Sequence, residues 1–309
     1  MASEHKPKIS VITPSLNTGK YLRDTIESVL AQTYQNYEFI VVDGGSTDGT
    51  IDILKEYPQI RWISEKETDK NKILEAYRKA FAMSRGDYII QCCISDGFLS
   101  KNWFAACSDC LDKDHDVSLV WGMPQWMRED GSLERVWHHE FLKKSPPQKQ
   151  DFFIYWLAYQ QGFAESNYCV RRRVFDECFT PRNKTEPFNV GIHYEFLYEF
   201  HARGYLSYFL PIVASFGRAH PHQRVESLLD ELDKEGKIYN KLSKEYKKNI
   251  LEGRITHYFR NGSSEIIGEI KKADLASIRW ELVKYYMKYQ IGKTLRKAQE
   301  QLMPYYQKF

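Results

Sequence analysis

Residues 9–93 alternate between short apolar runs and stretches with helical spacing, and this alternation most constrains the fold. The apolar runs, which predict strands, are Ile9 to Thr13, Glu38 to Asp43, Arg61 to Ser64 and Asp87 to Cys93. The stretches between them, which predict helices, start at Tyr21 (with Leu22, Ile26, Val29 and Leu30 on one face), run from about Thr50 to Tyr57, and run from Asn71 to Met83. Strands that alternate with helices form parallel sheets. The sequence therefore predicts an α/β domain with a Rossmann-like, mostly parallel sheet flanked by helices, and Pro14 is expected to end the first strand.

Polar residues stand where the predicted strands end. Thr13, Asp43 and Ser64 close three of the runs, and the pair Ser95-Asp96 follows the fourth. In open parallel sheets ligands bind beyond the carboxyl ends of the strands, so these side chains are expected to share one site. The chain has no GxGxxG and no GxxxxGK[ST] motif, which disfavours a dinucleotide site and a P-loop.

Charge and hydropathy limit which binding partners and which cellular location the sequence predicts. The formal net charge is +3, which gives no reason to expect nucleic acid as a partner. No apolar run approaches the roughly 18 residues that span a bilayer, and the opening MASEHKPKIS has no apolar signal core. We therefore expect a cytoplasmic protein with reduced thiols. Cys107 and Cys110 form a CxxC, but no second CxxC and no matching His pair accompany it, so we interpret both as core residues.

The amino-acid composition changes twice after residue 117. Residues 118–216 are rich in aromatic side chains, among them Trp121, Trp126, Trp137 and Trp156, which bind sugar rings or fill a core. After Glu226 the chain is Lys-rich with helical spacing. From Lys271 onward it contains nine Lys or Arg residues and three Asp or Glu residues. We expect a main domain over residues 1–225 and a helical, basic C-terminal extension over 226–309. That extension either contacts a membrane surface, placing the protein peripherally on the inner face, or docks on the main domain.

The opening region resembles the bacterial family 2 glycosyltransferases. The motif T-P-S-x-N, an amphipathic helix, Q-x-Y and V-D-G-G-S-T-D-G-T carry the resemblance, which is strong over Lys8 to Leu99 and traceable to about Val225. Members of that family are inverting enzymes of the GT-A fold that use nucleotide-sugar donors. The resemblance therefore implies this fold and this activity.

In that family the ends of the first two strands hold the nucleotide. The resemblance places Thr13, Pro14 and Asp43 against the base and ribose, and a carboxylate at Asp43 can accept the N3–H of uracil or bond ribose hydroxyls. A carboxylate of the third region completes the pocket, and we assign it to Asp69, with Glu67 as the alternative.

A further acidic motif binds a divalent cation in the family. Here it reads Ile94-Ser95-Asp96-Gly97, so that Ser95 and Asp96 face the nucleotide and Asp96 matches the metal carboxylate. Mn²⁺ or Mg²⁺ suits oxygen ligands and would offset charge on the leaving diphosphate. Ile94 and Gly97 depart from the family pattern, since Ile94 stands where an acidic residue or Asn is usual and Gly97 stands where the following Asp is usual.

Three later segments match family blocks. Arg171 and Arg172 match a pair on the acceptor side, with bonding inside the domain as the alternative, and His220 matches a late His near the diphosphate. His193 stands where the family has its catalytic Asp, and Glu195 matches a Glu two residues later. The resemblance therefore makes His193 or Glu195 the general base, because an imidazole or a carboxylate can take the acceptor's proton.

Together these features predict a glycosyltransferase that moves a sugar from a UDP-sugar to a hydroxyl of a bacterial surface glycan on a lipid carrier, with inversion. One rival is a GT-A-fold binding or scaffold protein with impaired catalysis, which Ile94, Gly97 and His193 favour. The other is a nucleotidyltransferase, which would need a Gly-rich, basic phosphate loop that TPSLNTGKYL does not provide.

Overall fold

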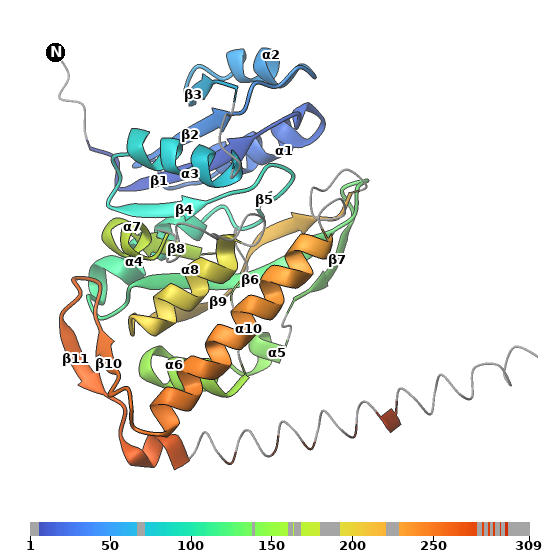
Figure 1. Cartoon of the computed structure of the whole chain (residues 1–309). Coiled ribbons are helices and arrows are strands. Elements are labelled where there is room, and N and C mark those ends of the chain that lie inside the picture. The colour runs from blue at the N-terminus through green and yellow to red at the C-terminus, as the bar shows by residue number, and fades with distance from the viewer. Residues whose placement is uncertain are drawn as a thin grey trace, which may run out of the picture.

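A computed structural model gives the fold of the chain. It describes residues 6–66, 72–137, 140–159, 163, 168–179, 192–220 and 229–276, with positions 280, 284, 287, 291, 294 and 295 of the C-terminal segment. The elements lie in layers around one large curled sheet (Figure 1).

The four strands expected in residues 9–93 are present. They are β1 (Ile9–Ser15), β2 (Tyr37–Asp43), β3 (Arg61–Ser64) and β4 (Tyr88–Gln91), and they pair in parallel in the order β3-β2-β1-β4. The expectation that Pro14 ends the first strand is wrong, because Pro14 pairs with Val42 and β1 continues to Ser15. Pro14 is tolerated because β4 pairs only as far as Ile12, so this part of β1 has one neighbour and needs fewer backbone donors.

The expected helices connect these strands. They are α1 (Gly19–Leu30), α2 (Thr50–Lys55) and α3 (Lys72–Met83). Leu22, Ile26 and Val29 of α1 are fully buried, as their spacing on one helix face predicts.

The rest of the sheet is mixed in direction. Its strands are β8 (Tyr168–Arg171), β6 (Leu119–Met127), β9 (Ser207–Arg218), β5 (Gly97–Phe98) and β7 (Leu133–Val136). β8 is antiparallel to both β4 and β6, and β9 is parallel to β6, so β6 and β9 run in the same direction as β1. The carboxyl ends of β6 and β9, at Met127 and Arg218, therefore reach the sheet edge at which β1 ends. We call this edge the carboxyl edge.

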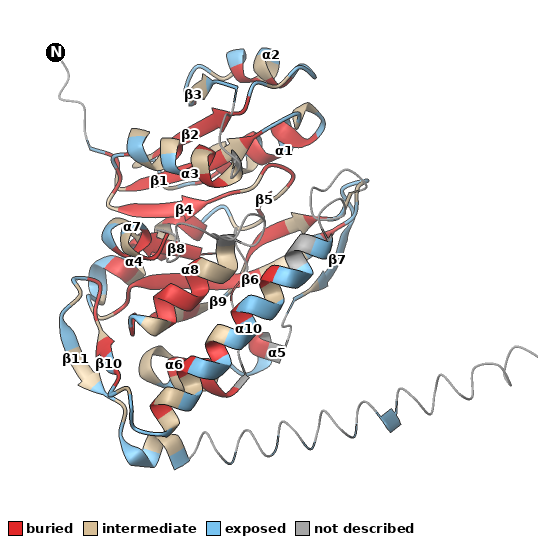
Figure 2. Ribbon diagram, in the orientation of Figure 1, coloured by how far each residue is buried: buried red, intermediate tan, exposed pale blue. Residues whose placement is uncertain are grey.

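Helices cover both faces of the sheet. One face packs against α1, α2 and α4 (Trp103–Lys113), and the other packs against α3, α6 (Lys149–Tyr159), α7 (Arg172–Cys178), α8 (Ile192–Ala202) and α10 (Leu229–Leu251). Alternate strand residues such as Val11 and Ile12 belong to opposite clusters, which is the pattern of a sheet buried on both sides. Figure 2 shows the buried strands between the partly exposed helices. The short helix α5 (Glu140–Lys143) and the ribbon of β10 (Tyr258–Arg260) and β11 (Ile266–Glu269) complete the described elements.

The helix α10 shares the core of the main domain. Tyr239, Tyr246 and Ile250 are buried in the cluster that contains Trp156, whose indole N–H donates to the Tyr239 hydroxyl over 3.2 Å. The expected division at residue 225 stays a prediction, as does membrane contact by the segment from Lys271. No helix among the described residues is both long enough and apolar enough to cross a bilayer.

The CxxC lies inside a packed helix. Cys107 of α4 is fully buried, and burial raises the pKa of its thiol well above the usual range. Burial also raises the pKa of Cys110 to about 11, so both thiols stay protonated at neutral pH. These properties favour core packing over a redox or zinc role.

Two histidines are buried in the core beneath α10. The His201 ring stacks on Trp156, with centroids 4.1 Å apart, and the His257 ring stacks on Phe153 at 4.8 Å. The hydroxyl of Tyr246 lies 2.6 Å from Nδ1 of His257. Burial lowers the pKa of His201 to about 3 and that of His257 to about 4, so the fold holds both rings neutral.

These rings predict a loss of stability in mild acid. Between about pH 6.5 and pH 4 the unfolded chain binds protons at both histidines and the folded chain does not, so the free energy of unfolding falls as the pH falls. Each histidine contributes a slope that approaches about 1.4 kcal/mol per pH unit. Urea unfolding between pH 7.5 and 5.5 measures it. His257→Phe should reduce the slope, whereas His115→Gln, at an exposed position, should not. An unchanged slope in His257→Phe would contradict the assignment.

Candidate functional site

Three strands end side by side at the carboxyl edge. Ser15 of β1 lies opposite Asp43 of β2, and Asp43 lies opposite Ser64 of β3. The parallel pairing therefore brings Asp43 and Ser64 together, as their places at the strand ends predict, and adds Ser15, which the sequence analysis did not select. Asp43 is the central member of this row.

The Asp43 carboxylate is fully buried and organises the turn that follows it. Its Oδ2 accepts the backbone N–H of Gly45 over 2.9 Å, the backbone N–H of Ser46 over 2.8 Å, and the Ser64 hydroxyl over 2.7 Å. Its Oδ1 accepts the Ser46 hydroxyl. A carboxylate has about four acceptor positions, two on each oxygen, so the capacity for a further donor lies on Oδ1.

Thr13 brings a buried hydroxyl to the same end of β1. Its Oγ1 has no hydrogen-bond partner among the described residues, and the side chain is fully buried. Such a group costs roughly 1–3 kcal/mol unless something bonds it. Pro14 is half-buried beside it. Asp69 and its alternative Glu67 lie outside the described residues.

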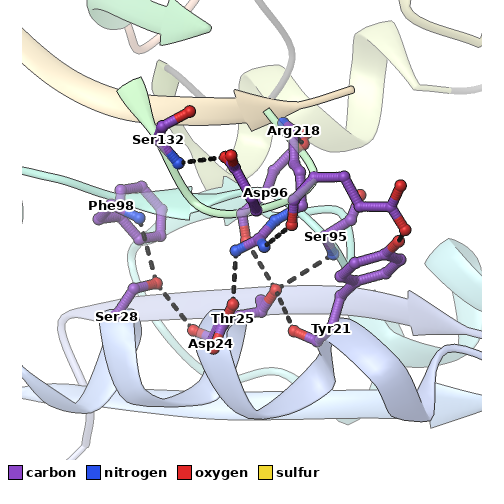
Figure 3. A network of polar contacts seen from close by, with 11 residues as sticks. Tyr21, Asp24, Thr25, Ser28, Ser95, Asp96, Phe98, Ser132 and Arg218 are labelled. Carbon is purple, nitrogen blue, oxygen red and sulfur yellow. Dashed lines mark hydrogen bonds and ion pairs between the residues drawn. The ribbon is translucent and has the colours of Figure 1, made fainter. Parts of the chain in front are cut away.

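The Ser95-Asp96 pair lies in a strained loop after β4. Ser95 has a φ of +85°, in the left-handed region that a side chain disfavours. The Thr25 hydroxyl of α1 holds the loop: it accepts the N–H of Ser95 over 3.2 Å and donates to the carbonyl of Asp96 over 2.6 Å (Figure 3). Strain held by specific bonds is typical of functional loops, because the surrounding structure must keep it in place.

Arg218, at the end of β9, contacts the Asp96 side chain. Its backbone N–H donates to Asp96 Oδ1 over 3.1 Å. Its buried guanidinium pairs with Asp24 of α1 at 2.5 Å and donates to the backbone carbonyl of Glu129 over 3.2 Å (Figure 3). Sequence reasoning did not select Arg218 or Thr25; the signal for Arg218 was its place two residues before His220.

His220 belongs to the same cluster. Its ring lies 4.4 Å from the Tyr21 ring, and the Arg218 guanidinium lies 5.3 Å from that ring. The Tyr21 hydroxyl donates to the Glu129 carboxylate over 2.9 Å. His220 thus lies in the cluster of Tyr21 and Arg218 beside the Asp96 loop, and its role toward a diphosphate stays a prediction.

Position 97 has no room for a side chain in the packing that surrounds it. A Cβ on Gly97 would lie 2.5 Å from Ser28 Oγ and 2.7 Å from the Phe216 ring, far inside contact distance. Ile94 is buried as well. No three His, Cys, Asp or Glu side chains within the described ranges form a possible metal site. Asp96 therefore fits a cation as a single carboxylate ligand, a mode that Mg²⁺ accepts when phosphates and water supply the other ligands.

His193 and Glu195 lie in the first turn of α8, and both are half-buried. A short turn joins α8 to β9, and β9 runs toward the carboxyl edge. Before that turn α8 runs along the sheet in the direction opposite to β9, so its first residues lie toward the carboxyl edge. Figure 1 shows this arrangement of α8 and β9. The topology therefore brings both candidate bases to the end of the molecule where Asp96 lies.

Arg171 and Arg172 lie elsewhere. Arg171 pairs with Tyr88 at the start of β4, the opposite edge of the sheet. Its guanidinium donates to the carbonyls of Val117 (2.8 Å) and Leu111 (2.6 Å), whereas Arg172 donates to the carbonyl of Gly86 (2.6 Å). These contacts correspond to the alternative of bonding inside the domain, and the structure does not bring either arginine to Asp96.

Comparisons with known proteins agree with this geometry. Over 55 residues the chain is 54% identical to the putative teichuronic acid biosynthesis glycosyltransferase TuaG of Bacillus subtilis, covering 18% of this chain and 22% of that protein. Over 131 residues it is 34% identical to chondroitin synthase of Escherichia coli, covering 41% and 18%. The structure of S. aureus TarS 1-349 in complex with UDP matches with a TM-score of 0.51 at 16% identity, covering 72% of this chain and 63% of that one.

Each of these matches spans less than two thirds of the other protein's length. The structural likeness confirms the GT-A fold that the resemblance implied. Residues 10–180, more than half of the chain, match the model of Glycosyl transferase family 2. With the expected fold in place and the motif residues gathered at one edge of its sheet, the chain belongs to glycosyl transferase family 2.

Proposed function

We propose that the chain transfers a sugar, with inversion, from a UDP-sugar to a hydroxyl of a glycan or lipid-linked oligosaccharide. The observation that carries the proposal is that Thr13 and Asp43, near the carboxyl ends of β1 and β2, and Asp96, in the loop after β4, lie at the carboxyl edge of the sheet in a family 2 chain. A parallel sheet binds ligands at this edge, and a nucleotide sugar needs both a base pocket and a position for its diphosphate.

The donor's nucleotide would bind at the ends of β1 and β2. Thr13 Oγ1 is a buried hydroxyl without a partner in the described residues, and Asp43 Oδ1 retains acceptor capacity, which suits the N–H and hydroxyl groups of uridine. Pro14 would pack against the base, with Asp69 completing the pocket. The structure of S. aureus TarS 1-349, which was solved in complex with UDP, supports this choice of nucleotide.

The diphosphate would lie against the Ser95-Asp96 loop. Thr25 and the Arg218 N–H fix the orientation of Asp96, so that its carboxylate would hold Mn²⁺ or Mg²⁺ as one oxygen ligand. Such a cation, when bound, supplies positive charge where negative charge gathers on the departing UDP. His220 would contact the same phosphates.

The reaction is one in-line displacement. The acceptor oxygen forms a bond to the anomeric carbon while the bond from that carbon to the UDP oxygen breaks, and UDP leaves with the electron pair. The acceptor's proton goes to the general base, which we assign to His193 or, as the alternative, Glu195. Because the attack comes from the face opposite the leaving group, the anomeric configuration inverts.

The acceptor would be a growing bacterial surface polysaccharide. The names of the two curated relatives, a teichuronic acid biosynthesis glycosyltransferase and a chondroitin synthase, support a polysaccharide product. The basic segment from Lys271 would hold the protein peripherally on the inner face of the membrane, near lipid-linked substrates.

The first prediction tests the nucleotide pocket. Asp43→Ala should weaken UDP binding by roughly 1–3 kcal/mol, because it removes an acceptor and releases the turn at Gly45 and Ser46. Calorimetric titration of UDP measures the change, and thermal unfolding checks the fold. Ser64→Ala, which removes one bond to Asp43 and leaves the carboxylate, is the matched control and should have the smaller effect. Unchanged UDP affinity in a folded Asp43→Ala protein would remove Asp43 from the pocket.

The second prediction concerns the cation and turnover. Wild-type protein should release UDP from a UDP-sugar in the presence of Mn²⁺ and an acceptor, and Asp96→Asn should lower both turnover and the Mn²⁺ dependence of UDP affinity. Asp114→Asn, at a carboxylate that pairs with Lys149, is the control. Full activity in EDTA would refute the cation role. UDP binding without turnover on any donor and acceptor would favour the scaffold alternative, which Gly97 supports.

The third prediction identifies the base. If His193 takes the proton, turnover should fall at acid pH through an apparent pKa of roughly 6–7, and His193→Ala should lose about 10²–10⁴-fold in kcat with little change in donor affinity. If Glu195 is the base, Glu195→Gln should lower kcat severely, and His193→Ala should lower it only mildly. Steady-state kinetics across pH separate the two. Robust turnover in both variants would show that neither residue is the base.

A further inference from the structure

Two tryptophans lie exposed beside each other near the end of β6. Trp126 of β6 is 36% exposed and Trp137, directly after β7, is 41% exposed. Their ring centroids are 6.2 Å apart and their planes differ by 38°. The backbone N–H of Trp137 donates to the backbone carbonyl of Pro124 over 2.9 Å, which holds the residue after β7 against β6. Large aromatic rings are usually mostly buried, so this pair leaves an apolar surface in water.

The pair borders the Asp96 loop across Gly217. β6 and β9 pair in parallel with Trp126 opposite Gly217, which has no side chain to cover the ring. A methyl group at Gly217 would lie 3.6 Å from Trp126 Cζ3 on one side and 3.9 Å from Asp96 Oδ1 on the other. The next residue, Arg218, donates its N–H to that same Asp96 oxygen. The ring edge and the carboxylate therefore face the same small space.

The surroundings of the pair do not suit a protein partner that adds a strand. β7 carries exposed Glu134 and Arg135, and the Glu134 carboxylate pairs with Arg128 at 2.7 Å. Charges on an outer strand oppose pairing with another sheet. Figure 2 shows most of β7 coloured as exposed, and only Val136 at its end is partly buried. A ligand with an apolar face and polar edges fits two rings within a charged rim better than a second chain does.

We infer that Trp126 and Trp137 form a stacking platform for a sugar ring of the acceptor. A pyranose has C–H groups on its faces and hydroxyls on its edges, so it can lie on an aromatic face while its hydroxyls stay hydrated or point toward Asp96. This inference rests on the proposed function. In that function the donor's nucleotide occupies the β1 and β2 side of Asp96, which leaves the β6 and β7 side for the acceptor.

The experiment first identifies an acceptor and then tests the platform. Wild-type protein is assayed on a panel of tagged oligosaccharides and lipid-linked analogues, with UDP-glucose, UDP-galactose and their N-acetylated amino forms as donors. For an elongated acceptor, Trp126→Leu and Trp137→Leu should each raise the acceptor KM by about three- to tenfold, the usual worth of an aromatic contact. UDP affinity should not change. Trp126→Phe and Trp137→Phe should retain most of the acceptor affinity, because a ring remains.

Leu133→Ala is the matched control, since Leu133 is 48% exposed on the same hairpin but has no ring. Its acceptor KM should equal that of the wild type. An acceptor KM unchanged in folded Trp→Leu variants, with normal turnover, would overturn the platform and leave the proposed function intact. If the wild type elongates nothing in the panel, the proposed function fails and the platform fails with it. Thermal unfolding midpoints confirm that each variant is folded.

Discussion

The hydrogen bond from the Arg218 N–H to the Asp96 carboxylate joins the two halves of the sheet at the candidate site. Asp96 follows β4, in the parallel half, whereas Arg218 ends β9, in the mixed half. The same arginine reaches back to Asp24 of α1 with a buried guanidinium. A buried charge is stable only when it is paired and bonded, so this ion pair and the bond to the Glu129 carbonyl keep the end of β9 against α1. The position of Asp96, and with it the proposed diphosphate site, depends on this contact.

The part of the core beneath α10 packs against α8, the helix whose first turn carries the two candidate bases. The stacked rings of His201 and His257 connect α8, α6 and the segment after α10, and α8 carries the two candidate bases at its other end. His201 thus packs the last turn of α8 against α6. The C-terminal residues up to the β10 and β11 ribbon contribute to the same packing, since Tyr246 and Phe259 lie in the main cluster.

Local patterns in the sequence predicted the fold of residues 9–93 well, and long-range contacts account for what these patterns missed. The periods of residues 9–93 predict β1 to β4 and α1 to α3 to within a few residues, because each element displays its own buried face. The pairing of β6 with β9 joins residues far apart in sequence, and nothing local in Gly217 or Arg218 indicates it. For the same reason the sequence could not distinguish Arg171 as a ligand contact from Arg171 as a partner of backbone carbonyls, which depends on which edge of the sheet β8 reaches.

The packing around Gly97 also limits which residues position 97 can hold. Ser28 of α1 and Phe216 of β9 occupy the volume that any side chain at position 97 would need, and Ser28 Oγ already accepts the N–H of Phe98. A substitution to an acidic residue there would therefore require the Ser28 and Phe216 side chains to shift, with a loss of packing or of the hydrogen bond to Phe98. The departure from the family motif at Gly97 is thus built into the packing of α1 against the end of β9, and not confined to the loop that carries Asp96.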